Sequence, residues 1–219
     1  MDRTALEEAC KALPLFPLSG VVLMPGNLLP LHVFEPRYRQ LVRDCLGSGG
    51  PLSVPQINPS AGADPGPAPP ILPFAGVGFI TAHQERSDGR YDIVLEPLGR
   101  VRIVEELKDT GHPYRVGRAE LLEDSPVVER DLAREGERVR GLFGALLARS
   151  GPKSQGMLRA LGSVAPTRVP DAMAAMAFRD DEMRQAFLAE NDPLRRAHMV
   201  EDAVLMLLAE APGGTVAEA

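Results

Sequence analysis

A lysine followed by a serine, in the stretch SGPKSQG, is the first residue pair that could do chemistry. A phosphate-binding loop of the form GxxxxGK(S/T) needs a glycine directly before the lysine, where this sequence has Pro152. A Ser-Lys nucleophilic pair needs a buried lysine of lowered pKa beside an aligned hydroxyl, and adjacency in sequence does not supply that geometry. We therefore interpret Lys153 and Ser154 as loop residues.

The histidines are the next candidates for catalysis or metal binding. They are scattered, without HExxH or another close ligand pair, at His32, His83, His112 and His198. We predict that His198, which shares a helical face with apolar residues, is packed and hydrogen-bonded. The acid pairs Glu105-Glu106 and Asp180-Asp181 show no partner for acid/base work, and the second suits a helix cap. We expect no catalytic residue, no metal site and no cofactor.

The two cysteines, Cys10 and Cys45, are too far apart in sequence for a CxxC site and too few for a disulfide framework. We interpret them as reduced thiols of a cytoplasmic protein. Cys45 falls on an apolar helical stripe, where a thiol packs as a small hydrophobe.

A mixture of aromatic, charged and apolar residues at the end of LLPLHVF is better suited to binding than to catalysis. The candidates for a peptide-binding surface are His32, Phe34, Glu35, Arg37 and Tyr38. Apolar burial would provide affinity for an extended peptide, and Arg37 or Glu35 would fix its register. In the alternative interpretation Tyr38 belongs to the core, Glu35 caps a helix and Arg37 is solvated.

Two arginines in GRVRI suggest a second kind of partner. Arg100 and Arg102 alternate with Val101 and Ile103, which predicts a strand with one face to the core and the arginines toward water. They are the candidate contacts of an RNA-binding alternative. Aromatic residues do not interleave with them, so we favour a solvated strand face with acidic partners and do not expect nucleic acid to bind.

Composition restricts the class of protein. The 219 residues are 44% apolar and 25% charged, with a net charge of −6 and a pI near 5.3, which is typical of a soluble globular chain and unfavourable for phosphate binding. The uncharged run from Leu13 to Phe34 contains four prolines, which exclude a membrane helix. The preceding MDRTALEEACKA is mixed in charge and does not resemble a secretory leader.

The elements that must position the candidates begin in this run. The turn PGN separates two extended segments. Tyr38, Leu41, Val42 and Cys45 then follow a helical period, with Pro36 in the first turn and a left-handed cap expected at Gly47. Residues 58–70 contain few large apolar residues, so we predict a mobile surface loop there. Four further β runs follow, the first two joined by a turn at Asp88-Gly89.

After Pro126 the pattern becomes helical. VVERDLAREGERVRGLFGALLARSG has an apolar stripe opposite its charges, and shorter helices lead to a last helix with Asp192 as its N-cap. We predict a disordered tail at 211–219. Strands followed by helices indicate an α+β fold.

Three blocks stand out in order: LPLFPLSGVVLMPGNLLPLHVFEPRYRQLVRDCL, then GVGFITAHQERSDGRYDIVLEPLGRVRIVEEL, then YRVGRAELLED. They closely resemble the amino-terminal substrate-binding domain of Lon proteases, and more closely its stand-alone bacterial versions. The helical end, with MRQAFLAENDPLRRA, is similar to the small bundle of that family. The resemblance implies a PUA-like β fold with helices attached, as in the Lon-like region of cereblon, and recognition of protein or peptide segments. It does not extend to the ATPase module or the Ser-Lys proteolytic domain of a whole Lon protease.

We therefore predict a PUA-like, partly closed antiparallel sheet or pseudo-barrel of about six strands, with one short helix, at residues 1–124. A small helical bundle is expected at 125–210. The predicted function is a non-catalytic module that binds exposed apolar segments of unfolded or extended proteins or peptides, as an adaptor in proteolysis or quality control. A protease or chaperone is expected as a further partner, and no membrane. An RNA-binding PUA-like protein and a small hydrolase with a pocket between the β and helical parts remain alternatives.

Overall fold

The computed structural model describes residues 2–61, 68–149 and 154–210. The packing of the backbone divides the chain into two compact units, Met1–Glu123 and Asp124–Ala219. The centre of the predicted loop, Lys153 and the predicted tail at 211–219 lie outside the described residues.

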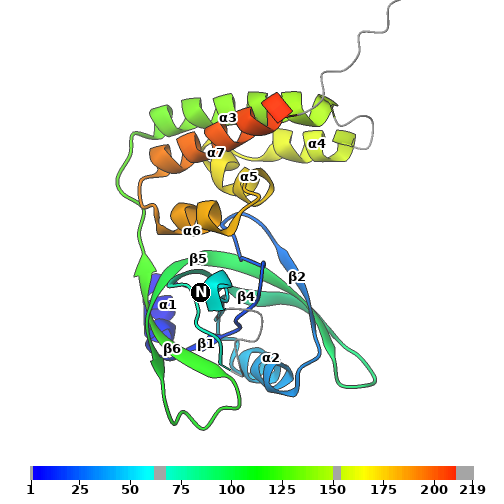
Figure 1. Ribbon diagram of the computed structural model, residues 1–219, viewed down its shortest axis with the longest axis vertical. Coiled ribbons are helices and arrows are strands. Elements are labelled where there is room, and N and C mark those ends of the chain that lie inside the picture. The colour runs from blue at the N-terminus through cyan, green and yellow to red at the C-terminus, as the bar shows by residue number, and fades with distance from the viewer. Residues whose placement is uncertain (1, 62–67, 150–153, 211–219) are drawn as a thin grey trace, which may run out of the picture. The chain divides into compact units, whose positions relative to one another are not determined.

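The described part of the first unit contains one six-stranded sheet, in the order β2-β5-β4-β3-β1-β6 (Figure 1). Neighbouring strands are antiparallel except β1 and β3, which are parallel. The α+β fold with a sheet of about six strands is thus confirmed. The strands are β1 (Leu13–Leu15), β2 (Leu29–Val33), β3 (Leu52–Val54), β4 (Phe74–Glu85), β5 (Tyr91–Leu107) and β6 (Arg115–Leu122).

Strand β5 is the longest and bends the sheet into a partial ring. β4 pairs with one side of β5, while the other side pairs first with β2, at Tyr91–Leu95, and then with β6, at Arg100–Leu107. Register shifts in both ladders mark bulges, which increase the bend of a sheet. The turn between β4 and β5 is as predicted, because Gly89 has a φ of 77° and the Arg86 amide donates to the Arg90 carbonyl at 2.8 Å.

Helix α2 (Pro36–Ser48) follows β2 and packs its apolar stripe into the core. Tyr38, Leu41, Val42 and Cys45 are buried in one cluster with residues of β2 and β5, which confirms the helical period. The predicted left-handed cap at Gly47 is wrong, and the helix ends two residues later. The Ser48 hydroxyl donates to the Asp44 carbonyl at 2.8 Å and continues the last turn, and Gly49, with a φ of 64°, forms the left-handed cap.

The first unit also contains α1 (Arg3–Ala9), which contributes Leu6 to a second apolar cluster around Val77 and Val101. A β carbon at Gly76 would lie 1.9 Å from the carbonyl oxygen of Leu23. Gly76, the first glycine of GVGFIT, therefore allows the segment that contains Leu23 to cross β4 closely.

The second unit consists of helices: α3 (Glu129–Arg149), α4 (Gln155–Ser163), α5 (Val169–Ala177), α6 (Asp181–Ala189) and α7 (Pro193–Glu210). α7 packs against α3 and α5. Asp192 accepts a hydrogen bond from the Leu194 amide at 2.9 Å, and Asp180 accepts one from the Met183 amide at 2.7 Å, so both predicted caps are confirmed. None of the described helices combines the length and apolarity that a membrane crossing requires.

Candidate functional site

The strands β2, β5 and β4 present one face to the core and the other to solvent. On β2, Val33 is buried with Ile93 and Leu95 of β5, whereas Pro30 and His32 face outward. The ladder register then aligns a row of outward residues across the three strands. We call this surface the outer face; it comprises Pro30, His32, Ala82, Gln84, Asp92 and Val94.

A depression of about 540 Å³ lies on the outer face and is lined by these six residues among others. A second one, of about 450 Å³, adjoins it toward the turn between β4 and β5 and shares His32, Gln84 and Arg86 with it. Together they form an open groove, and a groove that is open to solvent suits a chain segment better than a small molecule held on all sides.

One carboxylate joins a histidine and an arginine at the middle of the outer face. His32 Nδ1 donates to Asp92 Oδ1 at 2.6 Å, and Arg86 Nε donates to Asp92 Oδ2 at 2.7 Å. The hydrogen bond from His32, and then the one from Arg86, hold the pKa of Asp92 below its usual range. Asp92 is therefore ionised at neutral pH, and the network fixes His32 beside the groove.

Phe34 is the most exposed aromatic candidate, with 61% of its surface accessible. Its ring stacks near that of His32, with centroids 6.4 Å apart, and Leu28, before β2, is equally exposed. Large apolar side chains left in water beside a groove are typical of a binding surface.

The first turn of α2 holds the other three candidates. Arg37 Nε donates to Glu35 Oε2 at 2.9 Å, and the Arg37 guanidinium lies 4.5 Å from the centre of the Tyr38 ring. Tyr38 itself is only 5% exposed and packs on Phe16 at 4.4 Å between centroids, as in the core alternative. Glu35 precedes the helix, but its side chain makes no capping hydrogen bond. Tyr38 is thus a core residue whose ring packs against the Arg37 guanidinium, while Glu35 and Arg37 are half-buried.

The two arginines of the RNA alternative differ from each other. Arg102 is exposed and paired with Glu120 at 2.6 Å, as expected of a solvated strand face. The prediction that Arg100 faces water is wrong, since it is only 4% exposed. Arg102 lies between the same two strands, β4 and β6, and is exposed, so the alternation along β5 does not by itself decide burial. Farther along, Arg118 pairs with Glu105 at 2.8 Å and Arg115 pairs with Glu106. This part of the sheet is a ladder of neutralised pairs and not a basic patch.

Of the other candidate reactive groups, Cys45 and Ser154 are buried, whereas His198 is exposed. Burial, and then the charge of Asp44, raise the pKa of the Cys45 thiol to about 12. The Ser154 hydroxyl is buried and donates to the Leu147 carbonyl at 2.6 Å. The prediction that His198 is packed is wrong, since 57% of its side chain is exposed.

Sequence reasoning did not find Asp92 or Arg86. The local sequence feature that bears on their position is the Asp88-Gly89 turn, which sets the register of β4 and β5 and so places Arg86 near Asp92. The pairing of β2 with β5, which brings Asp92 to His32, has no such signal.

Comparison with known proteins decides the family. Residues 12–205 match the model of the ATP-dependent protease La (LON) substrate-binding domain. The chain belongs to this family. Among solved structures, the LON domain superposes on the N-terminal domain of the Mycobacterium avium complex Lon protease with a TM-score of 0.68 at 12% identity, covering 89% of this chain and 98% of that one. A Lon N-terminal domain protein from Xanthomonas campestris is 26% identical with a TM-score of 0.58, covering 92% and 99% of the two chains.

Curated relatives of this LON-domain chain are longer. The Lon protease of Desulfovibrio desulfuricans is 28% identical over 90% of the chain, but the match spans only 22% of that protein. Lon protease 2 of Myxococcus xanthus is 28% identical over 54% of the chain and 14% of its own length. The chain therefore covers less than a quarter of each of these relatives.

Proposed function

We propose that the chain is a binding module for extended, apolar segments of proteins, and that these segments lie across the outer face beside Phe34. The observation that carries the proposal is the 61% exposure of Phe34 next to an open groove, in a domain of a family defined by substrate binding. An apolar side chain of the bound segment would cover the Phe34 ring and remove both from water.

Strand β2 offers a second contact for the same segment. It is a terminal strand of the sheet, and among the described strands only β5 pairs with it. An extended peptide can add to such an edge through main-chain hydrogen bonds, with Pro30 limiting the available donors to a short stretch. The Asp92 network would supply polar contacts where the two depressions of the groove meet.

The module is proposed to be non-catalytic and to deliver its bound segment to a protease or chaperone supplied by another chain, in proteolysis or quality control. The family model that the chain matches is that of the substrate-binding domain. We also infer a reducing compartment such as the cytoplasm, because Cys10 and Cys45 are both free thiols.

Fluorescence anisotropy with a labelled, reduced and carboxymethylated protein that cannot refold would test the proposal. Phe34→Ser is expected to weaken binding about tenfold, since one large apolar contact is lost. Val128→Ser is the matched control, because Val128 is 62% exposed and belongs to the second unit.

Both side chains are exposed, so circular dichroism should show that both variants fold. Equal weakening by the two substitutions would mean that any exposed apolar group contributes, and unchanged binding by Phe34→Ser would remove the outer face as the site. Either result would contradict the proposal.

A further inference from the structure

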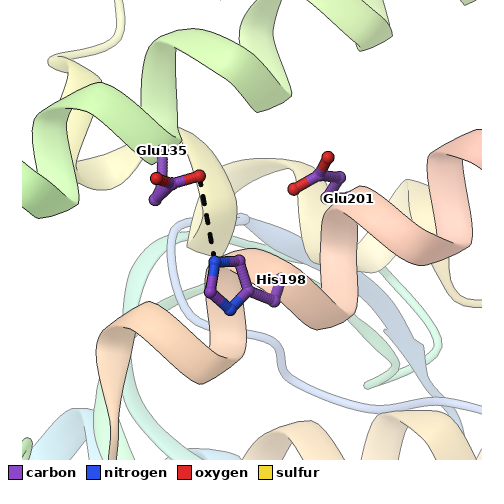
Figure 2. Close-up of side chains that lie close together, drawn as sticks. All are labelled: Glu135, His198 and Glu201. Atoms are coloured by element: carbon purple, nitrogen blue, oxygen red, sulfur yellow. Dashed lines mark ion pairs between the residues drawn. The ribbon is translucent and has the colours of Figure 1, made fainter.

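A histidine and two carboxylates from two helices converge in the second unit (Figure 2). Glu135 lies on α3, while His198 and Glu201 lie on α7. The spacing of three residues places His198 and Glu201 on the same side of α7, and α3 packs against that helix. One potential ligand atom of each residue lies within 4.8 Å of the other two.

Glu135 is a buried carboxylate, which is uncommon in proteins unless the charge is paired. The residue is 8% exposed, and its Oε2 is buried without a hydrogen-bond donor among the described residues, while Oε1 accepts from Arg134 at 3.2 Å. Oε2 points toward His198 Nε2, but the 3.8 Å between them is too long for a hydrogen bond (Figure 2). A buried carboxylate oxygen with no donor is costly, so this oxygen indicates a missing cationic partner.

The side chains of His198 and Glu201 are placed so that both could bind a cation beside Glu135. His198 is 57% exposed at its side chain, so its ring can change rotamer without disturbing the core. Glu201 is 9% exposed at its side chain, and its Oε1 pairs with Arg138 at 2.7 Å. That ion pair orients the carboxylate and leaves its second oxygen for another ligand.

We propose that Glu135, His198 and Glu201 bind a divalent transition-metal ion, for which Zn²⁺ is the best fit. Zn²⁺ accepts one imidazole nitrogen and two carboxylate oxygens, whereas Mg²⁺ and Ca²⁺ prefer oxygen ligands alone. Ligand atoms around tetrahedral Zn²⁺ lie about 3.3 Å apart, so the distances within the present group, which reach 4.8 Å, must contract by up to about 1.5 Å. The ion would join α3 to α7, with water in the remaining position.

Arg138 limits the affinity of this site, because its guanidinium competes with the ion for Glu201. It is 64% exposed at its side chain, so its removal should leave the fold intact. Arg138→Ala is therefore expected to strengthen metal binding by about two- to fivefold, the range of an exposed ion pair. If the three residues only stabilised the packing of the helices, Arg138→Ala would not increase metal affinity.

Isothermal titration of the chelator-treated full chain with ZnCl₂ would test the site. We expect one ion per chain and a higher unfolding temperature, since the ion binds only the folded arrangement. His198→Ala and Glu201→Gln should each weaken binding at least about tenfold. His112→Ala is the matched control, because His112 is 46% exposed at its side chain, lies beside Asp44 and belongs to the first unit.

Co²⁺ as a second probe would report the ligand set through its visible absorption. Equal loss of Zn²⁺ binding in His112→Ala and His198→Ala would show adventitious histidine binding and overturn the proposal. Absence of saturable binding in the wild type and in Arg138→Ala would overturn it as well.

Discussion

Cys45 shows how burial controls the chemistry of a single residue. It lies on the core side of α2, where it is 4% exposed, and its thiol pKa is raised to about 12 by burial and by the nearby charge of Asp44. Only the thiolate is a good nucleophile, so the folded thiol is chemically silent near neutral pH.

Thiol labelling at pH 8 should therefore report unfolding. We expect Cys45 and the equally buried Cys10 to resist iodoacetamide in the native chain and to react fully in guanidinium chloride. Because the folded pKa of Cys45 is raised, its contribution to stability is complete below about pH 9 and is lost as the pH rises toward about 12. Rapid labelling of the native chain would contradict the buried position of both thiols.

Arg196 is a buried charge whose partners decide its effect on stability. It is 3% exposed and donates to Asp124 at 2.7 and 2.8 Å and to Asp171 at 3.1 Å, all within the second unit. Arg196→Met should lower the free energy of unfolding by about 2–4 kcal/mol, less than for a fully buried pair because half of Asp124 is exposed.

The neighbouring Arg195 provides the control for this substitution. It is 73% exposed at its side chain and approaches acidic oxygens only at 3.9 and 4.0 Å. Arg195→Met should change the free energy of unfolding by less than about 0.5 kcal/mol. Urea denaturation of both variants measures the difference, and equal losses would argue against a special role for the Arg196 cluster.

Among the secondary-structure elements, α3 contains glycines in two very different environments. A β carbon at Gly136 would lie 1.8 Å from the carbonyl oxygen of Pro166, whereas one at Gly141 would meet nothing within 4 Å. Pro166 begins a short 3-10 helix, Pro166–Arg168, so Gly136 sets how closely that segment approaches α3.

Alanine substitutions at these two glycines should have opposite effects. Gly136→Ala is expected to destabilise the second unit by about 1–3 kcal/mol, since the helix and the Pro166 segment must separate. Gly141→Ala should stabilise it by about 0.5–1 kcal/mol, because alanine restricts the unfolded chain and favours helix. Thermal unfolding followed by circular dichroism distinguishes the two, and a stabilising Gly136→Ala would show that the close approach is not maintained.

The elements also show which features a sequence can predict. The stripe of α2, the caps of α6 and α7 and the turn at Gly89 follow from residues that are near each other in the chain, and they were predicted. The contact of His32 with Asp92 depends on the pairing of two strands whose residues lie 60 positions apart in the chain, and the burial of Arg100 depends on its tertiary surroundings; local periodicity contains neither kind of information.

His198 is a separate case. It lies beside the buried stripe of α7 rather than within it, because neighbouring helical positions differ by about 100° and the stripe includes Ala197, Val200 and Val204. The same displacement brings it to Glu135, which lies 63 residues away in the sequence, on a helix whose polar face gives no local sign of this contact.

For the whole molecule, charge is the property that separates the candidate partners. The net charge is −6, Arg100 is buried, and Arg102, Arg115 and Arg118 are paired with glutamates. Such a surface has little to offer a phosphate backbone.

We expect a labelled single-stranded RNA to show no saturable anisotropy change with the chain at about 50 mM salt, a concentration at which phosphate contacts are strong. Arg102→Ala should leave this result unchanged. Tight binding that weakens steeply with added salt and is lost in Arg102→Ala would instead favour the RNA-binding alternative.

The pairing of β1 with β6 also affects how the chain is made. Leu13 pairs with Gly117 and Leu15 with Arg115, so the first strand cannot complete its ladder until β6 has left the ribosome. At about 5–20 residues per second, the intervening stretch takes roughly 5–20 s to synthesise. During that interval β3 can pair with one side of β1, but the side that faces β6 lacks its final partner. We expect this apolar edge to make the nascent chain a client for chaperones.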